Sequence, residues 1–191
     1  MDSLIIKDNT VIACSETDIL SLKIPEGVTA IGDNAFLDFK KLSEIQLPST
    51  LKKIGDRAFE GCESLKLINI ENVSMIGVRA FAGCKSLSKI HFGDNIGYLC
   101  NATFCGCTAI EEIDIPKNIS YIGCECFKDC TGLTAIKLAG VMEIDNGAFE
   151  HCTELYSISL PYSLLHIAPN AFSFCTKLQS VIIQNRFIDI D

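Results

Sequence analysis

Seven phenylalanines recur along the chain at an almost constant spacing. They are Phe36, Phe59, Phe81, Phe104, Phe127, Phe149 and Phe172. Successive members are separated by 23, 22, 23, 23, 22 and 23 residues, although only 11 of the 191 residues are phenylalanine. Self-similarity at such a period is typical of solenoids, propellers and repeat arrays. The chain is therefore expected to bury its apolar side chains by stacking like units, since one unit this short has no core of its own.

Other residue types keep the same register as the phenylalanines. A small residue precedes each phenylalanine, a cysteine follows three positions later in all units but the first, and leucine or isoleucine follows after six positions. The cysteines of this column are Cys62, Cys84, Cys107, Cys130, Cys152 and Cys175. One unit therefore reads L-x-x-I-x-L-P-x-x-x-x-x-I-G-x-x-A-F-x-x-C-x-x.

The I-x-L part of each unit alternates apolar and polar residues and is rich in β-branched side chains, which predicts a short strand. Proline follows several of these strands and ends them, because it cannot donate to a ladder. A second short extended piece comes next, and Gly32, Gly55, Gly77 and Gly123 are expected to permit a sharp turn. The A-F-x-x-C segment is expected to form a single helical or 3₁₀ turn. Stacking would join the strands of successive units into one parallel sheet with buried Ile, Leu, Phe and Cys columns.

This pattern, present from Ile24 to Ile183, resembles the BspA-like leucine-rich repeats, also called the Treponema pallidum type. The resemblance implies a mainly β, right-handed leucine-rich-repeat solenoid with a concave parallel sheet, short convex strands and short 3₁₀ or helical turns. It also implies binding to a protein or matrix component, often at the surface of bacteria or protozoan parasites. The chain departs from the pattern at a few positions. Phe39 replaces the first cysteine, and Cys100, Asp145 and Ala168 replace glycine.

We expect a single leucine-rich-repeat domain over residues 1–191. It divides into an N-terminal capping hairpin with the first strand (1–24), about seven repeats of 22 or 23 residues (24–183), and a partial repeat at the C-terminal end (184–191). The C-terminal end shows no comparable cap. Either Phe187 and Ile188 fold back over the last repeat, or this end pairs with another molecule, which would allow self-association.

The net charge of −8 and the pI of about 4.9 argue against nucleic-acid binding, which needs clustered Lys and Arg. No apolar run approaches the length of a transmembrane helix, so no membrane insertion is expected. The first residues lack the basic and apolar parts of a signal peptide, and this favours the cytoplasm, as does a ladder of free thiols. The family resemblance instead favours a cell-surface or secreted protein, so both locations remain open.

The column cysteines have two interpretations. They are either small buried hydrophobic residues whose thiols meet loop carbonyls, or metal ligands or partners in disulfides between adjacent units. The first is favoured, because the chain has no C-x₂-C pair and no paired histidines of the kind that structural zinc sites use. Cys105 and Cys124 lie in C-x-C motifs whose other members, Cys107 and Cys126, already occupy buried columns. They are therefore expected to be exposed thiols, with a redox or metal role as the alternative.

The outward positions of the predicted sheet offer a binding surface, because repeat proteins commonly bind along such a face. Charge concentrates on the middle strands, at Lys89, His91, Glu112, Asp114 and Lys137. We expect these five residues to bind the ligand. The alternative is a solvated sheet face of mixed charge. No metal site is expected at His91, Glu112 and Asp114, because it would have a single histidine, and no cofactor is expected.

No catalytic residue is expected. The chain has three histidines, and none combines with a nucleophile and an orienting group in a predicted exposed site. No glycine-rich phosphate loop opens a helix. The sequence therefore predicts a non-enzymatic module. The family resemblance implies that this module binds a protein or extracellular-matrix ligand, with cell-surface adhesion as its role. The alternative is an intracellular scaffold or structural repeat protein that binds a protein partner.

Overall fold

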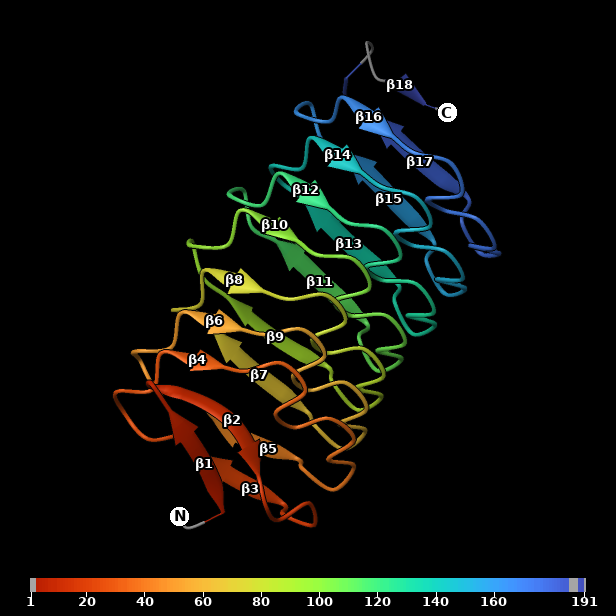
Figure 1. Ribbon diagram of the computed structural model, residues 1–191. Helices are drawn as coiled ribbons and strands as arrows, with labels where there is room; N and C mark the ends of the chain where they lie inside the picture. The colour runs from red at the N-terminus through yellow and green to blue at the C-terminus, as the bar shows by residue number, and fades with distance from the viewer. Residues whose placement is uncertain (1–2, 186–188, 191) are drawn as a thin grey trace.

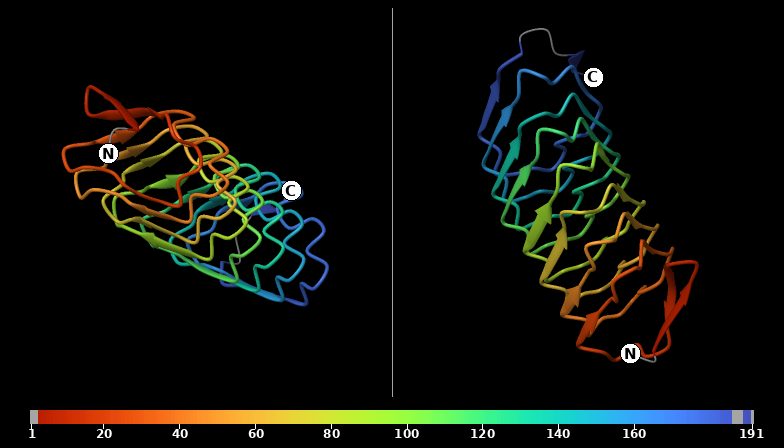
Figure 2. Two further views of the ribbon diagram at one scale, coloured as in Figure 1. Left: turned by 90° about the horizontal axis from the view of Figure 1, so that it is seen from below. Right: turned by 90° about the vertical axis from the view of Figure 1, so that its left-hand side faces the viewer.

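The computed structural model describes residues 3–185 and 189–190, and this part of the chain contains strands, turns and loops but no helix. The chain winds into coils stacked in a row, with an N-terminal hairpin at one end and the C-terminus at the other (Figure 1 and Figure 2). Each coil passes through a longer strand, a loop, a two-residue strand and a turn segment that holds the repeated phenylalanine. The predicted solenoid is confirmed.

The N-terminal hairpin consists of β1 (Leu4–Lys7) and β2 (Thr10–Cys14), which pair antiparallel. Asp8 and Asn9 form its turn with φ angles of 49° and 57°, the left-handed conformation that two-residue hairpin turns require. β2 then pairs in parallel with β4 (Ala30–Ile31) of the first coil. The hairpin thus gives the first coil a strand partner on its outer side, in place of a preceding repeat.

Most of the longer strands alternate exposed side chains with buried or partly buried ones, and only the last, β17, is exposed throughout. They are β3 (Ser21–Lys23), β5 (Glu44–Gln46), β7 (Leu67–Ile70), β9 (Lys89–Phe92), β11 (Glu112–Ile115), β13 (Ala135–Leu138), β15 (Ser157–Leu160) and β17 (Ser180–Ile183). In β11, for example, Ile113 is buried and its neighbours Glu112 and Asp114 are exposed. The first and third residues of these strands form what we call the concave face.

The ladder of longer strands is interrupted. β3 pairs with β5, β7 pairs with β9, and β11, β13, β15 and β17 form a four-stranded sheet. The coils that hold β5 and β7 are neighbours, as are those that hold β9 and β11, but these strands are not ladder partners. The predicted concave arrangement of parallel strands is confirmed, but its ladder is divided into three sheets rather than one. The repeat period sets the order of the strands. Whether neighbouring strands come close enough to form ladder hydrogen bonds depends on the side chains packed between the coils.

The two-residue strands form a second set of ladders on the convex side. Besides β4, they are β6 (Lys53–Ile54), β8 (Met75–Ile76), β10 (Tyr98–Leu99), β12 (Tyr121–Ile122), β14 (Glu143–Ile144), β16 (His166–Ile167) and β18 (Asp189–Ile190). Their pairing is parallel, and equivalent residues of successive repeats lie side by side. This ladder is also interrupted once, between β8 and β10. Both faces of the solenoid thus open near its middle.

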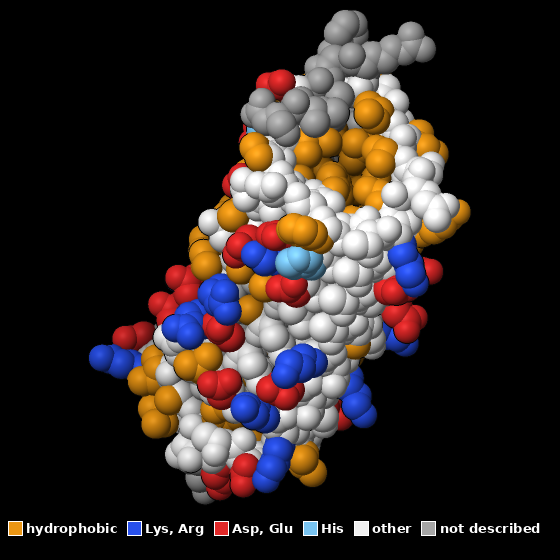
Figure 3. All heavy atoms as spheres, turned by 90° about the vertical axis from the view of Figure 1, so that its right-hand side faces the viewer, with side chains coloured by type: hydrophobic (Ala, Val, Ile, Leu, Met, Phe, Trp, Pro, Cys, Tyr) orange, Lys and Arg blue, Asp and Glu red, His pale blue; other side chains and the backbone are white. Residues whose placement is uncertain are grey.

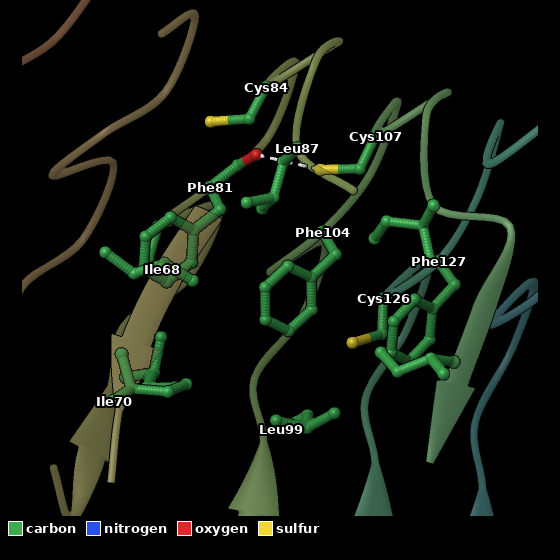
Figure 4. Close-up of a cluster of buried hydrophobic side chains, with 14 of the residues drawn as sticks. Ile68, Ile70, Phe81, Cys84, Leu87, Leu99, Phe104, Cys107, Cys126 and Phe127 are labelled. Atoms are coloured by element: carbon green, nitrogen blue, oxygen red, sulfur yellow. Dashed lines mark hydrogen bonds between the residues drawn. The ribbon is translucent and has the colours of Figure 1, made fainter. Parts of the chain in front are cut away.

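The repeated phenylalanines form one continuous stack through the core. Successive rings are nearly parallel, with centroids 5.2–5.5 Å apart and interplanar angles of 1–14°. Figure 4 shows the rings of Phe81, Phe104 and Phe127 side by side. All the rings of the stack except Phe172 are fully buried. Each buried ring is worth about 1.5–3 kcal/mol in transfer free energy, so this stack is a main source of stability.

The turn segments have two left-handed positions in every repeat. One lies two residues before the phenylalanine: Asn34, Arg57, Arg79, Ala102, Glu125, Gly147 and Asn170. The other lies two residues after it: Asp38, Gly61, Gly83, Gly106, Asp129, His151 and Phe174. A left-handed residue breaks a right-handed helix. The predicted helical or 3₁₀ turn is therefore replaced by hydrogen-bonded turns, as where the Cys62 N–H donates to the Phe59 carbonyl at 3.1 Å.

The column glycines serve close packing between repeats. Their φ angles are not left-handed. A Cβ on Gly77 would instead collide with the Asp56 carboxylate, which accepts a hydrogen bond from the next repeat at the Val78 N–H (2.8 Å). Gly55 and Gly123 have the same relation to Asp33 and Asn101. A turn does begin directly after each of these glycines, as predicted, but what requires glycine there is close packing rather than a left-handed backbone.

The glycine departures noted in the sequence follow from this packing. At Cys100 the preceding repeat has Val78 at the position of the Asp or Asn acceptor, and at Asp145 it has Cys124 there. Without a carboxylate or carboxamide at that point, the next repeat has room for a side chain. Asp145 uses this room to accept a hydrogen bond from the Tyr121 hydroxyl at 2.6 Å. Ala168 is not explained in this way, because Asn146 precedes it.

The C-terminal coil leaves its inward positions uncovered. Val181 and Ile183 of β17 are 49% and 44% exposed, whereas the equivalent residues Ile158 and Leu160 are buried. Exposed hydrophobic side chains gather near this end (Figure 3). β18 continues the convex ladder by pairing Ile190 with Ile167. Phe187 and Ile188, the predicted fold-back cap, lie outside the described residues.

Candidate functional site

The five predicted binding residues surround one hollow on the concave face. Its volume is about 310 Å³, and its lining comprises Ser88, Lys89, Ile90, His91, Ile110, Glu112, Ile113, Asp114 and Lys137. The residues come from β9, β11 and β13 and from the segments that enter β9 and β11. The structure thus brings together side chains that are separated by up to 48 residues in the sequence, from Lys89 to Lys137.

The hollow lies where the concave ladder opens between β9 and β11. Ile90 at its floor is only partly buried, whereas the equivalent Ile68 and Ile113 of the flanking strands are buried. Phe92 occupies the last position of β9, where β7 and β11 have isoleucine. Its ring contacts Phe104 edge-on, with centroids 6.1 Å apart. The extra bulk of this ring between the two coils is a physical reason for the opening.

Opposite charges lie on both sides of β11, but the two sides differ. Lys137 Nζ lies 3.1 Å from the Asp114 carboxylate, across the closed pair β11–β13, where both are the third residues of their strands. Lys89 and Glu112 are the first residues of β9 and β11, on the two sides of the opening. Within residues 3–185 and 189–190, neither of these two side chains forms an ion pair. The open ladder thus leaves one exposed cation and one exposed anion at the walls of the hollow.

The lining of the hollow combines apolar and charged side chains. Isoleucine side chains form its floor and charged side chains form its rim, which is the usual anatomy of the central part of a protein interface. The Ser88 hydroxyl, the one hydroxyl group of the lining, donates to the Lys66 carbonyl at 3.4 Å. In the part of the chain that the structure describes, no three His, Cys, Asp or Glu side chains gather as a metal site.

The column cysteines point their thiols at backbone carbonyls, and all except the partly buried Cys175 are buried. Each Sγ atom lies 3.1–3.2 Å from the carbonyl oxygen of the phenylalanine one repeat earlier, as for Cys107 and Phe81 (Figure 4). Burial raises the pKa of the Cys62 thiol to about 12 and that of Cys175 to about 11. The interpretation of these residues as small buried groups that meet loop carbonyls is confirmed.

The off-column cysteines are less uniform than expected. Cys107 and Cys126 are buried, as predicted for the occupied members of the C-x-C motifs. Cys105 and Cys124, predicted as exposed thiols, are only partly exposed, and burial raises the pKa of both. A raised thiol pKa lowers the thiolate fraction at neutral pH, and the thiolate is the reactive form. These environments therefore do not activate either thiol.

Charged clusters on the turn side of the solenoid were not predicted. Glu60 accepts hydrogen bonds from Arg57 Nε (2.6 Å) and Arg79 Nη2 (2.8 Å). Burial alone would raise the pKa of Glu60, but the hydrogen bonds from Arg79 and then Arg57 outweigh it and lower the pKa. An alignment of the residues next to each phenylalanine would have shown this cluster. Arg57 and Arg79 share the column two positions before the phenylalanine, and Glu60 directly follows Phe59.

A second cluster lies on the same side. His151 Nδ1 is 3.1 Å from the Asp129 carboxylate, and its ring centroid is 4.6 Å from that of Phe174. The side chain of Phe174 is 62% exposed, and its backbone has the left-handed conformation. These three residues share the column two positions after the repeated phenylalanine. Figure 3 shows charges of both signs scattered along the solenoid rather than gathered in one patch.

Solved structures of bacterial repeat proteins have the same fold. A leucine-rich repeat protein of T. pallidum is 26% identical, with a TM-score of 0.81 over 89% of this chain and 82% of that one. A leucine-rich repeat protein from Bacteroides ovatus is 27% identical (TM-score 0.75; 98% of this chain, 57% of that one), and one from Eubacterium ventriosum is 26% identical (0.79; 87% and 46%). The chain thus spans about half the length of the latter two proteins.

Comparison with protein families gives the assignment. The BspA type leucine-rich repeat region matches residues 6–134 and 98–191, with six copies. Among curated protein sequences, no relative matches the chain. The described residues contain no helix that is long and apolar enough to span a bilayer. Repeat motif, fold and family match agree, and the chain belongs to the family of BspA-type leucine-rich-repeat proteins.

Proposed function

We propose that this chain is a non-enzymatic module that binds another protein or a matrix component through its concave face, centred on the hollow between β9 and β11. One observation carries the proposal. Lys89, His91, Glu112, Asp114 and Lys137 surround a single hollow with an isoleucine floor. Interface energy usually concentrates in a few central residues beside such a pocket, and the charges around it set specificity and association rate.

Cell-surface adhesion is the role we propose for this binding. The support for this role is the family resemblance, which implies binding at cell surfaces. The second candidate is an intracellular scaffold, and one observation favours it. All eleven cysteines of the chain are unpaired, including the ladder of buried thiols, and such a content of free thiols suits a reducing compartment.

The proposal is tested by measuring binding to immobilised basement-membrane extract and to its purified protein components on a biosensor. Charge reversal in the double variant Glu112→Lys/Asp114→Lys is expected to weaken the binding by at least about tenfold, or about 1.4 kcal/mol. The matched control is Glu143→Lys with Glu71→Lys, which makes the same change of net charge at exposed positions off the concave face. It should leave the affinity within about twofold.

Two results would overturn the proposal. One is an unchanged affinity in the concave double variant with a loss in the control, which would move the binding surface to the convex side. The other is the absence of binding to every matrix protein together with failure of the peptide selection described below, which would remove the evidence for a binding module.

A further inference from the structure

We infer that the opening between β9 and β11 is a docking site for one apolar side chain of an extended segment of a protein partner. An acidic residue of that segment lies toward Lys89 and a basic residue toward Glu112. The inference rests on the proposed function, since it names the chemistry that the concave face recognises. Its support is the backbone, the floor and the charges of the hollow, which are independent features of the structure.

The backbone shows that the opening is specific to this place. In each of the other repeats, the residue just before a longer strand donates its N–H to the carbonyl of the equivalent residue one repeat earlier. The Ser88 N–H donates to the Lys66 carbonyl at 3.0 Å, and the Thr134 N–H donates to the Glu111 carbonyl at 2.8 Å. Among residues 3–185, the Glu111 N–H has no corresponding bond to the Ser88 carbonyl. The start of β11 is therefore detached from β9.

The floor of the opening is apolar and incompletely covered. Ile90 is only partly buried, and beside it lie the side chains of Ile110 and Ile113. Contact between water and this apolar surface is unfavourable, so an apolar group that displaces the water contributes favourable free energy. The volume of about 310 Å³ is at the lower limit of small-molecule pockets, and the hollow lies on an open sheet face. One anchoring side chain of a larger partner suits it better than a whole small ligand.

The charges at the walls define what flanks the anchor. Asp114 and Lys137 already neutralise one another across β11 and β13 at 3.1 Å. Lys89 and Glu112 are the members of the hollow whose opposite charges are separated by the opening, and both are exposed. A partner segment that brings one negative and one positive side chain would pair with both of them. A uniformly basic or acidic segment would satisfy one wall and be repelled by the other.

The test selects binders from a displayed library of random linear peptides, using the folded chain as bait. The key variant exchanges the two wall charges, Lys89→Glu with Glu112→Lys, and therefore keeps the net charge and the composition. Peptides selected on the native chain should carry an apolar residue between an acidic and a basic one. They should bind the exchanged variant at least about tenfold more weakly, and selection on that variant should return the opposite charge order.

The matched control exchanges an exposed ion pair away from the hollow, Asp18→Lys with Lys41→Asp, whose charged groups lie 3.1 Å apart. It should change the affinity of the same peptides by no more than about threefold. Hydrogen exchange gives a second measurement that needs no variant. The amides of Glu111 and Glu112 should exchange at least about tenfold faster than those of Thr134 and Ala135, and a bound peptide should slow them.

The outcomes separate this inference from the proposed function. Suppose the selected peptides bind the native chain and the Lys89→Glu/Glu112→Lys variant equally, but lose affinity on charge reversal elsewhere on the concave face. That result would overturn the docking site and leave the binding module intact. Equal amide exchange in β11 and β13 would overturn the opening itself. A chain that selects no peptide and binds no matrix protein would overturn both proposals.

Discussion

The solenoid has a turn side, formed by the segments around the repeated phenylalanines, and a sheet side, formed by the longer and two-residue strands. Both are built from the same repeats, yet the backbone hydrogen bonding between repeats is continuous on the turn side and interrupted on the sheet side. On the turn side, each phenylalanine N–H donates to the residue before the next phenylalanine, as from Phe59 to Ala80 (2.8 Å) and from Phe81 to Thr103 (2.9 Å). This bonding continues from Phe36 to Ala171 without a break. The concave and convex ladders both open between coils that the turn side holds closed.

The difference offers a way for one repeat protein to combine stability with the binding site proposed above. The stacked rings, the buried thiols and the turn hydrogen bonds fix the spacing of the coils along one side of the molecule. The sheet side can then open locally without separating the coils. The opening lies where Lys89, His91, Glu112, Asp114 and Lys137 gather on the concave face, away from the continuous turn side.

The largest effect is expected for the ring at the centre of the turn side. Phe104→Ala should lower the free energy of unfolding by about 3–5 kcal/mol, because a fully buried ring leaves a cavity between two stacked neighbours. Phe172→Ala, at the partly exposed end of the stack, should cost only about 1–2 kcal/mol. Urea unfolding measures both. A cost below about 1 kcal/mol for Phe104→Ala would show that the stack is not what holds the coils together.

A smaller effect is expected for the glycines that pack between repeats. In Gly77→Ala the new Cβ would fall on the Asp56 carboxylate and within 2.6 Å of the Gly55 backbone, and the variant should lose about 1–3 kcal/mol of stability. Gly97→Ala is the control, since nothing lies within 4 Å of that Cβ, and it should change stability by less than about 0.5 kcal/mol. Equal costs would mean that backbone entropy, rather than close packing, explains the glycine column.

Much of the turn side could be predicted from the sequence, because every repeat contributes the same residue type at the same position. The buried phenylalanine and cysteine columns follow from this register alone. The role of glycine did not, because it depends on a contact with a different column of the preceding repeat. Asp56 and Gly77 are close only after the coils have stacked, and a single repeat contains no sign of that contact.

The thiols of the turn side should make the protein sensitive to alkaline pH. Burial raises the pKa of Cys62 from its ordinary value of 9.0 to about 12. Above pH 9 the unfolded chain releases this proton and the folded chain keeps it. The contribution is therefore complete below pH 9 and is lost as the pH rises toward 12.

The measurement is the unfolding free energy at pH 8 and pH 10 in the presence of a reductant. Between these values the native chain should lose about 1.4 kcal/mol more than a Cys62→Ala variant does. Cys105→Ala, which removes a partly exposed thiol, is the control and should alter the pH dependence less. Identical pH profiles for the native chain and Cys62→Ala would mean that this thiol is not buried in solution.

The sheet side was predictable in part. The alternation of the longer strands placed Lys89, His91, Glu112, Asp114 and Lys137 on one exposed face, and the structure gathers them around one hollow. The opening that forms the hollow was not predictable. Phe92 satisfies the apolar pattern of its column as well as isoleucine would, and only its packing on Phe104 shows the difference. A periodic pattern reports which side chains point inward, but not whether their sizes allow neighbouring strands to close.

The smallest effect separates the closed and open parts of the concave face directly. A double-mutant cycle with Asp114→Ala and Lys137→Ala should give a coupling free energy of about 0.2–1 kcal/mol, because the pair is close but exposed. This coupling should shrink as salt is added, since exposed charges are screened. The same cycle with Lys89→Ala and Glu112→Ala should give no measurable coupling, although these two residues also carry opposite charges at equivalent positions of neighbouring strands. Equal coupling in the two cycles would show that β9 and β11 close in solution as β11 and β13 do, and the hollow would then lose the feature that distinguishes it from the rest of the concave face.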